Sequence, residues 1–123
     1  MIVLVVDDSK TNRMLLRAVL ESEGCDVLEA VDGQEALELL ECAKVDAVIS
    51  DILMPRIDGY QLCCEIRNHR KLRTLPVIFY TATNVSRRDE KRAREVGANR
   101  FLRKPASSGD IITALLELAS RSK

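Results

Sequence analysis

Five polar residues of this chain each follow a short apolar run, and their types suit metal and phosphate chemistry. Asp7 and Asp8 follow one run, Asp51 a second, Thr81 a third and Lys104 a fourth. If these runs are neighbouring parallel strands, their carboxyl ends meet at one edge of a sheet, where ligands of open α/β sheets bind. Two carboxylates about 4 Å apart repel by about 4 kcal/mol at an effective dielectric of 20. We therefore expect the three acids to take up a proton or a cation.

The cation that suits such oxygen ligands is Mg²⁺, which binds carboxylates, keeps several waters and bridges to phosphoryl oxygens. With two acids on the metal, a third carboxylate can attack phosphorus as a nucleophile and form an aspartyl phosphate. Thr81 could then donate a hydrogen bond to a phosphoryl oxygen, and Lys104 could neutralise its charge. Taken singly, the residues have ordinary explanations: Asp8 or Ser9 would cap a helix, and Asp51 would cap a turn. Their joint position at strand ends favours the site.

The apolar runs predict strands, and the segments between them predict helices. Residues 2–6 form a continuous apolar and mostly β-branched run, which is typical of a strand buried on both faces of a parallel sheet. Strands are predicted at residues 2–6, 27–30, 45–50, 77–80 and 100–102, and helices at 11–23, 34–43, 59–70, 85–97 and from about 107. Five strand–helix units indicate an open parallel sheet covered by helices on both faces.

Apolar side chains recur at helical spacing and predict which helix faces are buried. The predicted core positions are Leu15, Leu16, Val19, Leu20, Ala36, Leu37, Leu40, Ala43, Leu62, Cys63, Ile66, Ile111, Ile112, Leu115, Leu116 and Ala119. The helix at 85–97 offers only Val85, Ala93 and Val96 among many Arg and Lys residues. With so few apolar contacts, we expect it to be the element that shifts most easily.

The composition is that of one ordinary domain, with 123 residues, 46% of them hydrophobic and 31% charged. Its 19 Lys and Arg balance its 19 Asp and Glu, which argues against a general nucleic-acid or membrane binder. The balance hides a separation, because residues 1–55 hold twelve acids and four bases, whereas residues 56–123 hold seven acids and fifteen bases. No apolar run approaches the roughly 20 residues of a membrane span, and no signal peptide precedes the first strand. We therefore expect a cytoplasmic protein.

The cysteines and the single histidine do not predict a zinc or redox site. The four cysteines show no C-x-x-C spacing, and His69 alone leaves no zinc ligand set. Cys63 and Cys64 are adjacent on a predicted helix, about 100° apart, and are interpreted as small buried hydrophobic residues. His69 is interpreted as a solvated residue at a polar helix end.

Four motifs, in order, make the chain resemble a response-regulator receiver domain of two-component signalling. They are VVDDS at 5–9, DILMPRIDG at 51–59, YTA at 80–82 and GANRFLRKP at 97–105. The D-x-x-M-P-x-x-D-G pattern is highly specific, and it follows the third predicted strand. The resemblance extends over all 123 residues.

The resemblance implies a fold and a site. The fold is a flavodoxin-like (βα)5 three-layer α/β sandwich in one domain over residues 1–123, with a five-stranded parallel sheet of order 2-1-3-4-5. Asp51 would be the phosphoacceptor. The Mg²⁺ ligands would be Asp7, Asp8, Asp51 and the backbone carbonyl of Leu53.

The resemblance also assigns roles around the phosphoryl group. Thr81 and Phe101 would be the switch residues, and Lys104 would pair with the phosphoryl group. Pro105 would follow Lys104 through a cis peptide bond, which is a minority state for X-Pro. One departure from the family is Ala106, because many receivers have an aromatic residue after the Lys-Pro pair.

The implied phosphodonor is a histidine kinase or a histidine phosphotransfer protein. Further expected partners are an output domain in a longer chain or a second copy of the chain through the 85–121 face. An output domain would lie elsewhere in a longer chain, since these 123 residues contain no output module. Such a domain is a regulatory phosphoacceptor and not an enzyme beyond its own phosphoryl transfer and dephosphorylation. Two alternatives stay open: a pseudo-receiver that only binds partners, and an aspartate-nucleophile phosphohydrolase. The second is disfavoured because those enzymes place their acids as D-x-D, whereas Asp7 and Asp8 are adjacent.

Overall fold

The computed structural model describes residues 1–81 and 87–121, with side chains described up to residue 118 in the last helix. Within these residues strands and helices alternate along the whole chain. The strands are β1 (Ile2–Val6), β2 (Asp26–Ala30), β3 (Ala47–Ser50), β4 (Val77–Thr81) and β5 (Arg100–Arg103). The helices are α1 (Lys10–Ser22), α2 (Gly33–Cys42), α3 (Gly59–Asn68), α4 (Arg87–Glu95) and α5 (Ser108–Arg121). All strand pairs are parallel and the order is β2-β1-β3-β4-β5, so the predicted fold is confirmed.

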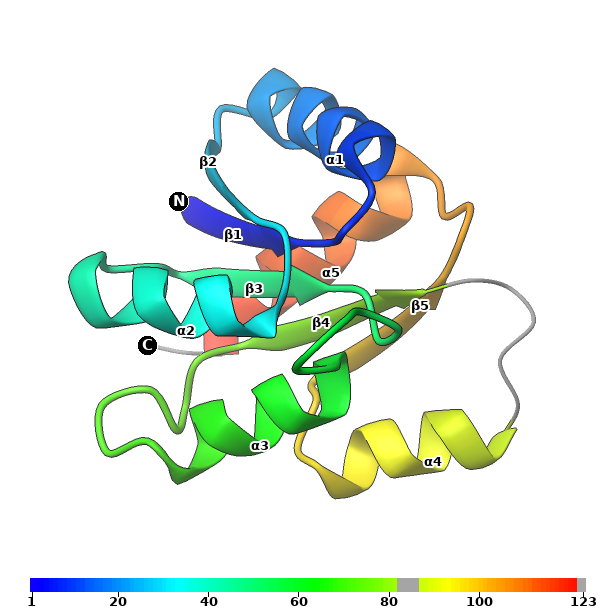
Figure 1. Cartoon of the computed structure of the whole chain (residues 1–123). Helices are drawn as coiled ribbons and strands as arrows, with labels where there is room; N and C mark the ends of the chain where they lie inside the picture. Colours follow the sequence, from blue (N-terminus) through cyan, green and yellow to red (C-terminus); the bar gives the residue numbers. More distant parts are fainter. Residues whose placement is uncertain (82–86, 122–123) are drawn as a thin grey trace.

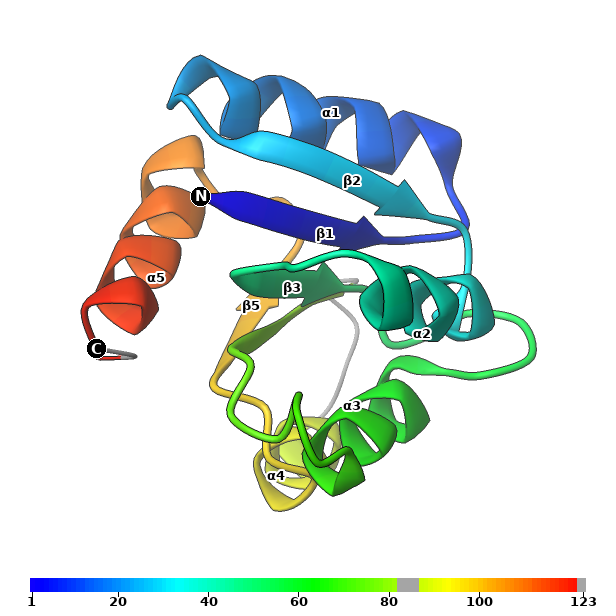
Figure 2. The ribbon, with the colours of Figure 1, turned by 90° about the vertical axis from the view of Figure 1, so that its left-hand side faces the viewer.

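The helices cover the sheet on both faces, with α1 and α5 on one side and α2, α3 and α4 on the other (Figures 1 and 2). Each face has its own apolar core. Val3, Val5 and Ile49 point towards α1 and α5, whereas Leu4 and Val48 belong to the cluster on the opposite face. This alternation explains why β1 and β3 are apolar at nearly every position: both of their faces are buried.

The strand register brings the polar residues together at one edge of the sheet. Val6 of β1 pairs with Ser50 of β3, so the residues that follow them, Asp7 and Asp51, emerge side by side. On the other side of β3, Thr81 ends β4 and pairs with Arg103, which immediately precedes Lys104. The site is therefore a direct consequence of the sheet order.

Side-chain caps define where two of the site-forming helices begin. Ser9 caps α1, accepting a hydrogen bond at its Oγ from the Asn12 amide at 3.3 Å, and Asp58 caps α3 by accepting from the Gln61 amide at 2.8 Å. Of the two candidate caps for α1, the structure uses Ser9. The Asp8 carboxylate is thus left exposed beside the strand ends.

The predicted core was wrong at two positions. The Leu15 and Leu116 side chains are 63% and 59% exposed, whereas their neighbours Leu16 and Leu115 are buried. Successive helical residues point about 100° apart, and the sheet covers only part of each apolar stripe. Of the other expected positions, Val85 and the side chain of Ala119 lie outside the described residues.

Helix α4 is held by few apolar contacts, as its sequence predicted. Only Ala93 of the helix is buried, while Arg87, Arg88, Lys91, Arg92 and Arg94 are exposed.

In the part of the chain that the structure describes, no helix is long and apolar enough to cross a membrane.

The cysteines and the histidine take ordinary structural positions. Cys63 is fully buried, Cys64 is half-buried and Cys42 is exposed. His69 follows α3 as its C-cap, half-buried, with Nε2 3.3 Å from the Glu41 carboxylate.

Candidate functional site: an acidic cluster at the strand ends

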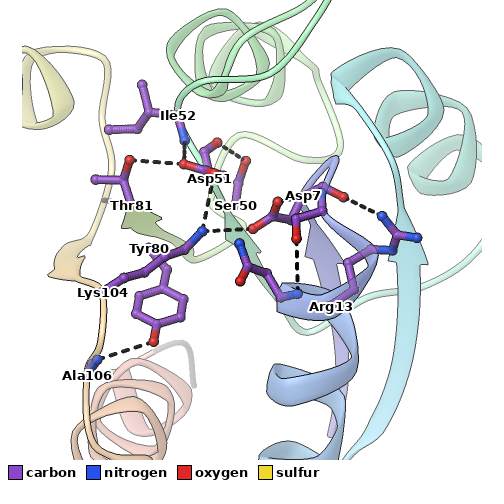
Figure 3. A network of polar contacts seen from close by, with 11 residues as sticks. Asp7, Arg13, Ser50, Asp51, Ile52, Tyr80, Thr81, Lys104 and Ala106 are labelled. Carbon is purple, nitrogen blue, oxygen red and sulfur yellow. Dashed lines mark hydrogen bonds and ion pairs between the residues drawn. The ribbon is translucent and has the colours of Figure 1, made fainter. Parts of the chain in front are cut away.

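Asp7 is almost completely buried, and four hydrogen bonds hold its polar atoms (Figure 3). Its amide donates to the Ala30 carbonyl at 3.1 Å, and its Oδ1 accepts from the Ser9 amide at 2.8 Å. The Lys104 ammonium donates to Oδ2 at 3.0 Å, and the Arg13 guanidinium donates to the backbone carbonyl at 2.7 Å. These contacts fix both the carboxylate and the backbone that leads to the next residue.

Asp51 lies at the centre of the site, with its side chain 14% exposed. Its Oδ1 accepts hydrogen bonds from the Ile52 amide at 2.7 Å and from the Thr81 hydroxyl at 2.9 Å. Its Oδ2 lies 3.3 Å from the Lys104 ammonium, and its backbone carbonyl accepts from the Ser50 hydroxyl at 2.7 Å. The carboxylate is therefore held in one orientation while part of it remains open to solvent.

Lys104 follows β5, and its ammonium contacts the carboxylates of both Asp7 and Asp51 (Figure 3). Burial works to lower the pKa of this ammonium, but the hydrogen bond to Asp7 and the negative charge of Asp51 outweigh it. The net effect raises the pKa of Lys104 above its usual value, so the side chain is a cation at neutral pH. The peptide bond between Lys104 and Pro105 is cis, as the resemblance implied.

The two expected switch residues lie on the neighbouring strands β4 and β5, where Thr81 pairs with Arg103 and Phe101 pairs with Phe79. Thr81 is fully buried, and its hydroxyl already points at Asp51. Phe101 is half-buried against the core on the α4 side, with the Arg103 guanidinium 5.4 Å from its ring centroid.

The predicted convergence of the three carboxylates is confirmed. One oxygen each from Asp7, Asp8 and Asp51 lies within 4.8 Å of the others. Asp7 is buried, Asp51 is half-buried and Asp8 is exposed, so the cluster opens to solvent on one side. Such an all-oxygen donor set fits a hard divalent cation that keeps part of its water shell. The side chain of Leu53, two residues after Asp51, is 69% exposed and lies outside the cluster's polar contacts.

Gly59 allows the loop after β3 to fold back onto Asp51. A Cβ at this position would lie 2.5 Å from the Asp51 carbonyl oxygen and 2.8 Å from the Ile52 Cα. Both atoms are backbone, so no side-chain rotation relieves such a clash. The glycine of the 51–59 motif is therefore required by the close approach of two backbone segments.

Sequence reasoning missed two contributors to the site. Arg13 was not identified, although a cation near the start of a helix is unfavourable to the helix dipole and signals a tertiary partner. Tyr80 was also missed: its hydroxyl accepts a hydrogen bond from the Ala106 amide at 3.2 Å, and its ring centroid lies 5.6 Å from the Lys104 ammonium. Tyr80, Lys104 and Ala106 also line a common pocket beside α1.

The site and the fold agree with comparisons to known proteins. The family model of the response regulator receiver domain matches residues 3–116, so the chain belongs to this family. The protein PilG of Pseudomonas aeruginosa is 37% identical over 113 residues, which are 92% of this chain and 83% of PilG. Several longer curated relatives match this chain over only 14%, 57% or 49% of their own length. Receiver domains are regulatory phosphoacceptors of two-component signalling.

Solved structures support the same assignment. A putative response regulator from Chloroflexus aurantiacus has a TM-score of 0.93 at 35% identity, with 98% of each chain covered. The receiver domain of the sensor histidine kinase PA1611 from Pseudomonas aeruginosa has a TM-score of 0.88 at 29% identity, with 97% of each chain covered. In that structure a magnesium ion is coordinated in the active-site cleft.

Proposed function

We propose that this receiver domain is a switch that takes a phosphoryl group onto Asp51 from the phosphohistidine of a histidine kinase or a histidine phosphotransfer protein. The observation that carries the proposal is the placement of the Asp51 carboxylate. It is partly open to solvent, lies in a cluster of three acids, and is contacted by one hydroxyl donor and one ammonium donor. A nucleophile, a cation site and groups for the incoming negative charge are thus present together.

The proposed cofactor is Mg²⁺, held by Asp7, Asp8, Asp51 and the backbone carbonyl of Leu53. The three carboxylates fit this ion because their oxygens are hard ligands and lie within 4.8 Å of one another. When bound, the ion neutralises charge on the phosphoryl oxygens during transfer. It would also compete with the Lys104 ammonium for Asp7 and Asp51, so that Lys104 becomes available for the phosphoryl group.

In the proposed transfer, one oxygen of the Asp51 carboxylate forms a bond to phosphorus as the phosphorus–nitrogen bond of the phosphohistidine breaks. The bonding electron pair stays on the imidazole nitrogen, which leaves and takes a proton. Lys104 supplies a fixed positive charge to the phosphoryl oxygens, and the Thr81 hydroxyl supplies a hydrogen bond. Hydrolysis of the aspartyl phosphate would return the carboxylate and release phosphate.

The product carries about −1.5 to −2 charges on Asp51, and this local change is the proposed signal. Thr81 would turn from the Asp51 carboxylate to a phosphoryl oxygen, and Phe101 would follow it. The surface formed by residues 81–105 would then change and control an output domain or a partner. The weakly anchored helix α4 lies in this surface, which supports the proposal.

A second copy of the chain through the 85–121 face is a further proposed partner. The face carries both signs of charge, including the ion pairs Arg103–Glu90 and Arg100–Glu117, each at 3.1 Å. A dimer would be tested by light scattering of the phosphorylated chain against a variant with Arg88→Glu and Lys91→Glu. Identical masses for the two proteins would contradict this interface.

The test of the phosphoacceptor uses acetyl phosphate with Mg²⁺, followed by intact-mass measurement. The wild type should gain one phosphoryl group, and Asp51→Asn should gain none. Asp58→Asn is the matched control, because it changes an aspartate of the same loop to a residue that also caps helices well. The assignment would be contradicted if Asp51→Asn gained a phosphoryl group, or if Asp58→Asn failed to gain one while Asp51→Asn did.

A further inference from the structure

The Arg13 guanidinium contacts the backbone of the acidic cluster at Asp7 (Figure 3) and also a carboxylate on β2. Its Nη1 donates to the Asp7 carbonyl oxygen at 2.7 Å, and its Nε donates to Glu29 of β2 at 2.9 Å. The Arg13 side chain is only 12% exposed. Glu29 also accepts a hydrogen bond from Arg17 at its other carboxylate oxygen, but Arg17 makes no contact with Asp7 among the hydrogen bonds of the described residues.

The Asp7 carbonyl oxygen has a particular geometric importance. It lies in the rigid peptide plane that also contains the Asp8 amide and the Asp8 Cα. The Asp8 carboxylate is exposed and, among the described residues, makes no hydrogen bond or ion pair of its own. The direction of Asp8 therefore depends on the backbone plane that Arg13 holds.

We propose that Arg13 is a positioning residue for the cation site. By holding the Asp7–Asp8 peptide plane, Arg13 directs the Asp8 carboxylate towards Asp7 and Asp51, and Glu29 keeps the guanidinium in place. The inference rests on the proposed binding of Mg²⁺ at this cluster. It adds a residue that touches neither the ion nor the phosphoryl group but sets the geometry of one ligand.

Charge alone predicts the opposite effect from positioning. Arg13 is a cation near the cluster, and removing a positive charge favours the binding of a divalent cation. Positioning predicts weaker binding, because Asp8 then samples orientations that do not point at the other two carboxylates. The sign of the change in Mg²⁺ affinity therefore separates the two effects.

The test compares two arginines of the same helix. Arg13→Met keeps the apolar stem and removes every donor. Arg17→Met also removes one positive charge and one ion pair to the Glu29 carboxylate, but it leaves the contact to Asp7 intact. Mg²⁺ affinity is measured by isothermal titration calorimetry, and Mn²⁺ affinity by electron paramagnetic resonance. We expect about tenfold weaker binding for Arg13→Met, in the range that outer-shell partners of metal ligands show. Arg17→Met should bind no more weakly than the wild type.

Conservative variants keep the inference falsifiable if Arg13→Met does not fold. Arg13→Lys retains one donor for the Asp7 carbonyl and should stay within about threefold of the wild type, while Arg13→Gln should be intermediate. Unchanged Mg²⁺ affinity in a folded Arg13→Met or Arg13→Gln would overturn the inference about Arg13 and leave the proposed cofactor intact. A wild type that binds no Mg²⁺ would overturn both the inference and the proposed cofactor.

Discussion

The Lys104 ammonium places a positive charge between two carboxylates at one end of the sheet. It lies 3.0 Å from Asp7 and 3.3 Å from Asp51, with its side chain 19% exposed. The pKa of Lys104 is raised in the folded state by its contacts with Asp7 and Asp51, so the stabilisation from these pairs is present in full below the ordinary pKa of a lysine. It is lost only as the pH rises through the folded-state pKa. Near neutral pH the pairs should therefore show no pH dependence through Lys104.

Replacing this cation should expose the repulsion between the two acids. Lys104→Met is expected to lower the free energy of unfolding by about 3 kcal/mol in metal-free buffer, at the lower end for a broken buried pair. Urea unfolding measures the loss, and added Mg²⁺ should recover part of it. Arg103→Met is the control, because its partner Glu90 is at the surface and such pairs contribute about 0–1 kcal/mol. An equal loss with and without Mg²⁺ would contradict the expectation.

Also at the scale of residues, burial determines which cysteines react. The apolar surroundings raise the pKa of the Cys63 thiol to about 11, so almost no thiolate is present at pH 8. Iodoacetamide at pH 8 should modify the exposed Cys42 and leave Cys63 unmodified in the folded protein. Peptide mapping by mass spectrometry measures both sites. Equal rates of modification at Cys42 and Cys63 would contradict this prediction.

At the scale of elements, Tyr60 connects the loop of the phosphoacceptor to helix α4. It follows Gly59 at the start of α3, and its hydroxyl donates to the Asp89 carbonyl at 3.0 Å. Its ring packs edge-on against Phe79 at 5.7 Å and lies under the Arg92 guanidinium at 4.3 Å. Tyr60 thus adds a hydrogen bond and a cation–π contact to the few apolar contacts of α4.

Removal of that hydroxyl should loosen α4. Tyr60→Phe keeps the ring but loses the hydrogen bond, so we expect faster amide hydrogen exchange along α4 and a global destabilisation of about 1 kcal/mol. Tyr80→Phe is the matched control, since its hydroxyl contacts Ala106 near α5 and not α4. Wild-type exchange rates for α4 in Tyr60→Phe would show that other contacts hold the helix.

The elements also show how far the sequence could predict this molecule. The β-branched run of β1 and the alternation of strands and helices predicted a parallel sheet with polar residues at its carboxyl end. The strand order that brings the acids together was implied by the family resemblance. Leu15 and Leu116 were misassigned, because a helical apolar stripe does not reveal how much of it the sheet covers. The contacts of Arg13 with the Asp7 carbonyl and with Glu29, and the approach of Gly59 to the Asp51 carbonyl, depend on how the loops after β1 and β3 turn. Hydrophobic periodicity carries no information about these turns.

At the scale of the whole molecule, the net charge of zero is the sum of an acidic first part, residues 1–55, and a basic second part, residues 56–123. The acidic first part supplies the three carboxylates of the cluster, and the basic second part supplies Lys104 and the exposed arginines of α4. The sheet brings these parts together at its carboxyl end, because β3 lies between β1 and β4, and β5 pairs with β4. A change of charge at that edge therefore acts on both parts.

This arrangement predicts that Mg²⁺ stabilises the folded chain. An ion that binds only the native cluster should add about 1.4 kcal/mol of stability for each tenfold rise in its concentration above the dissociation constant. The thermal midpoint should thus rise with Mg²⁺ and fall back with EDTA, and Asp8→Asn should reduce the effect. A midpoint independent of Mg²⁺ would contradict the proposed cofactor.

The central claim is that phosphorylation of Asp51 changes the surface formed by residues 81–105. The most direct measurement is the two-dimensional amide NMR spectrum of the whole chain with Mg²⁺, before and after addition of acetyl phosphate. We predict that shifts around Asp51 are accompanied by shifts across residues 81–105, including α4, and that Asp51→Asn shows neither. Shifts confined to the neighbours of Asp51, or the same shifts in Asp51→Asn, would contradict the claim.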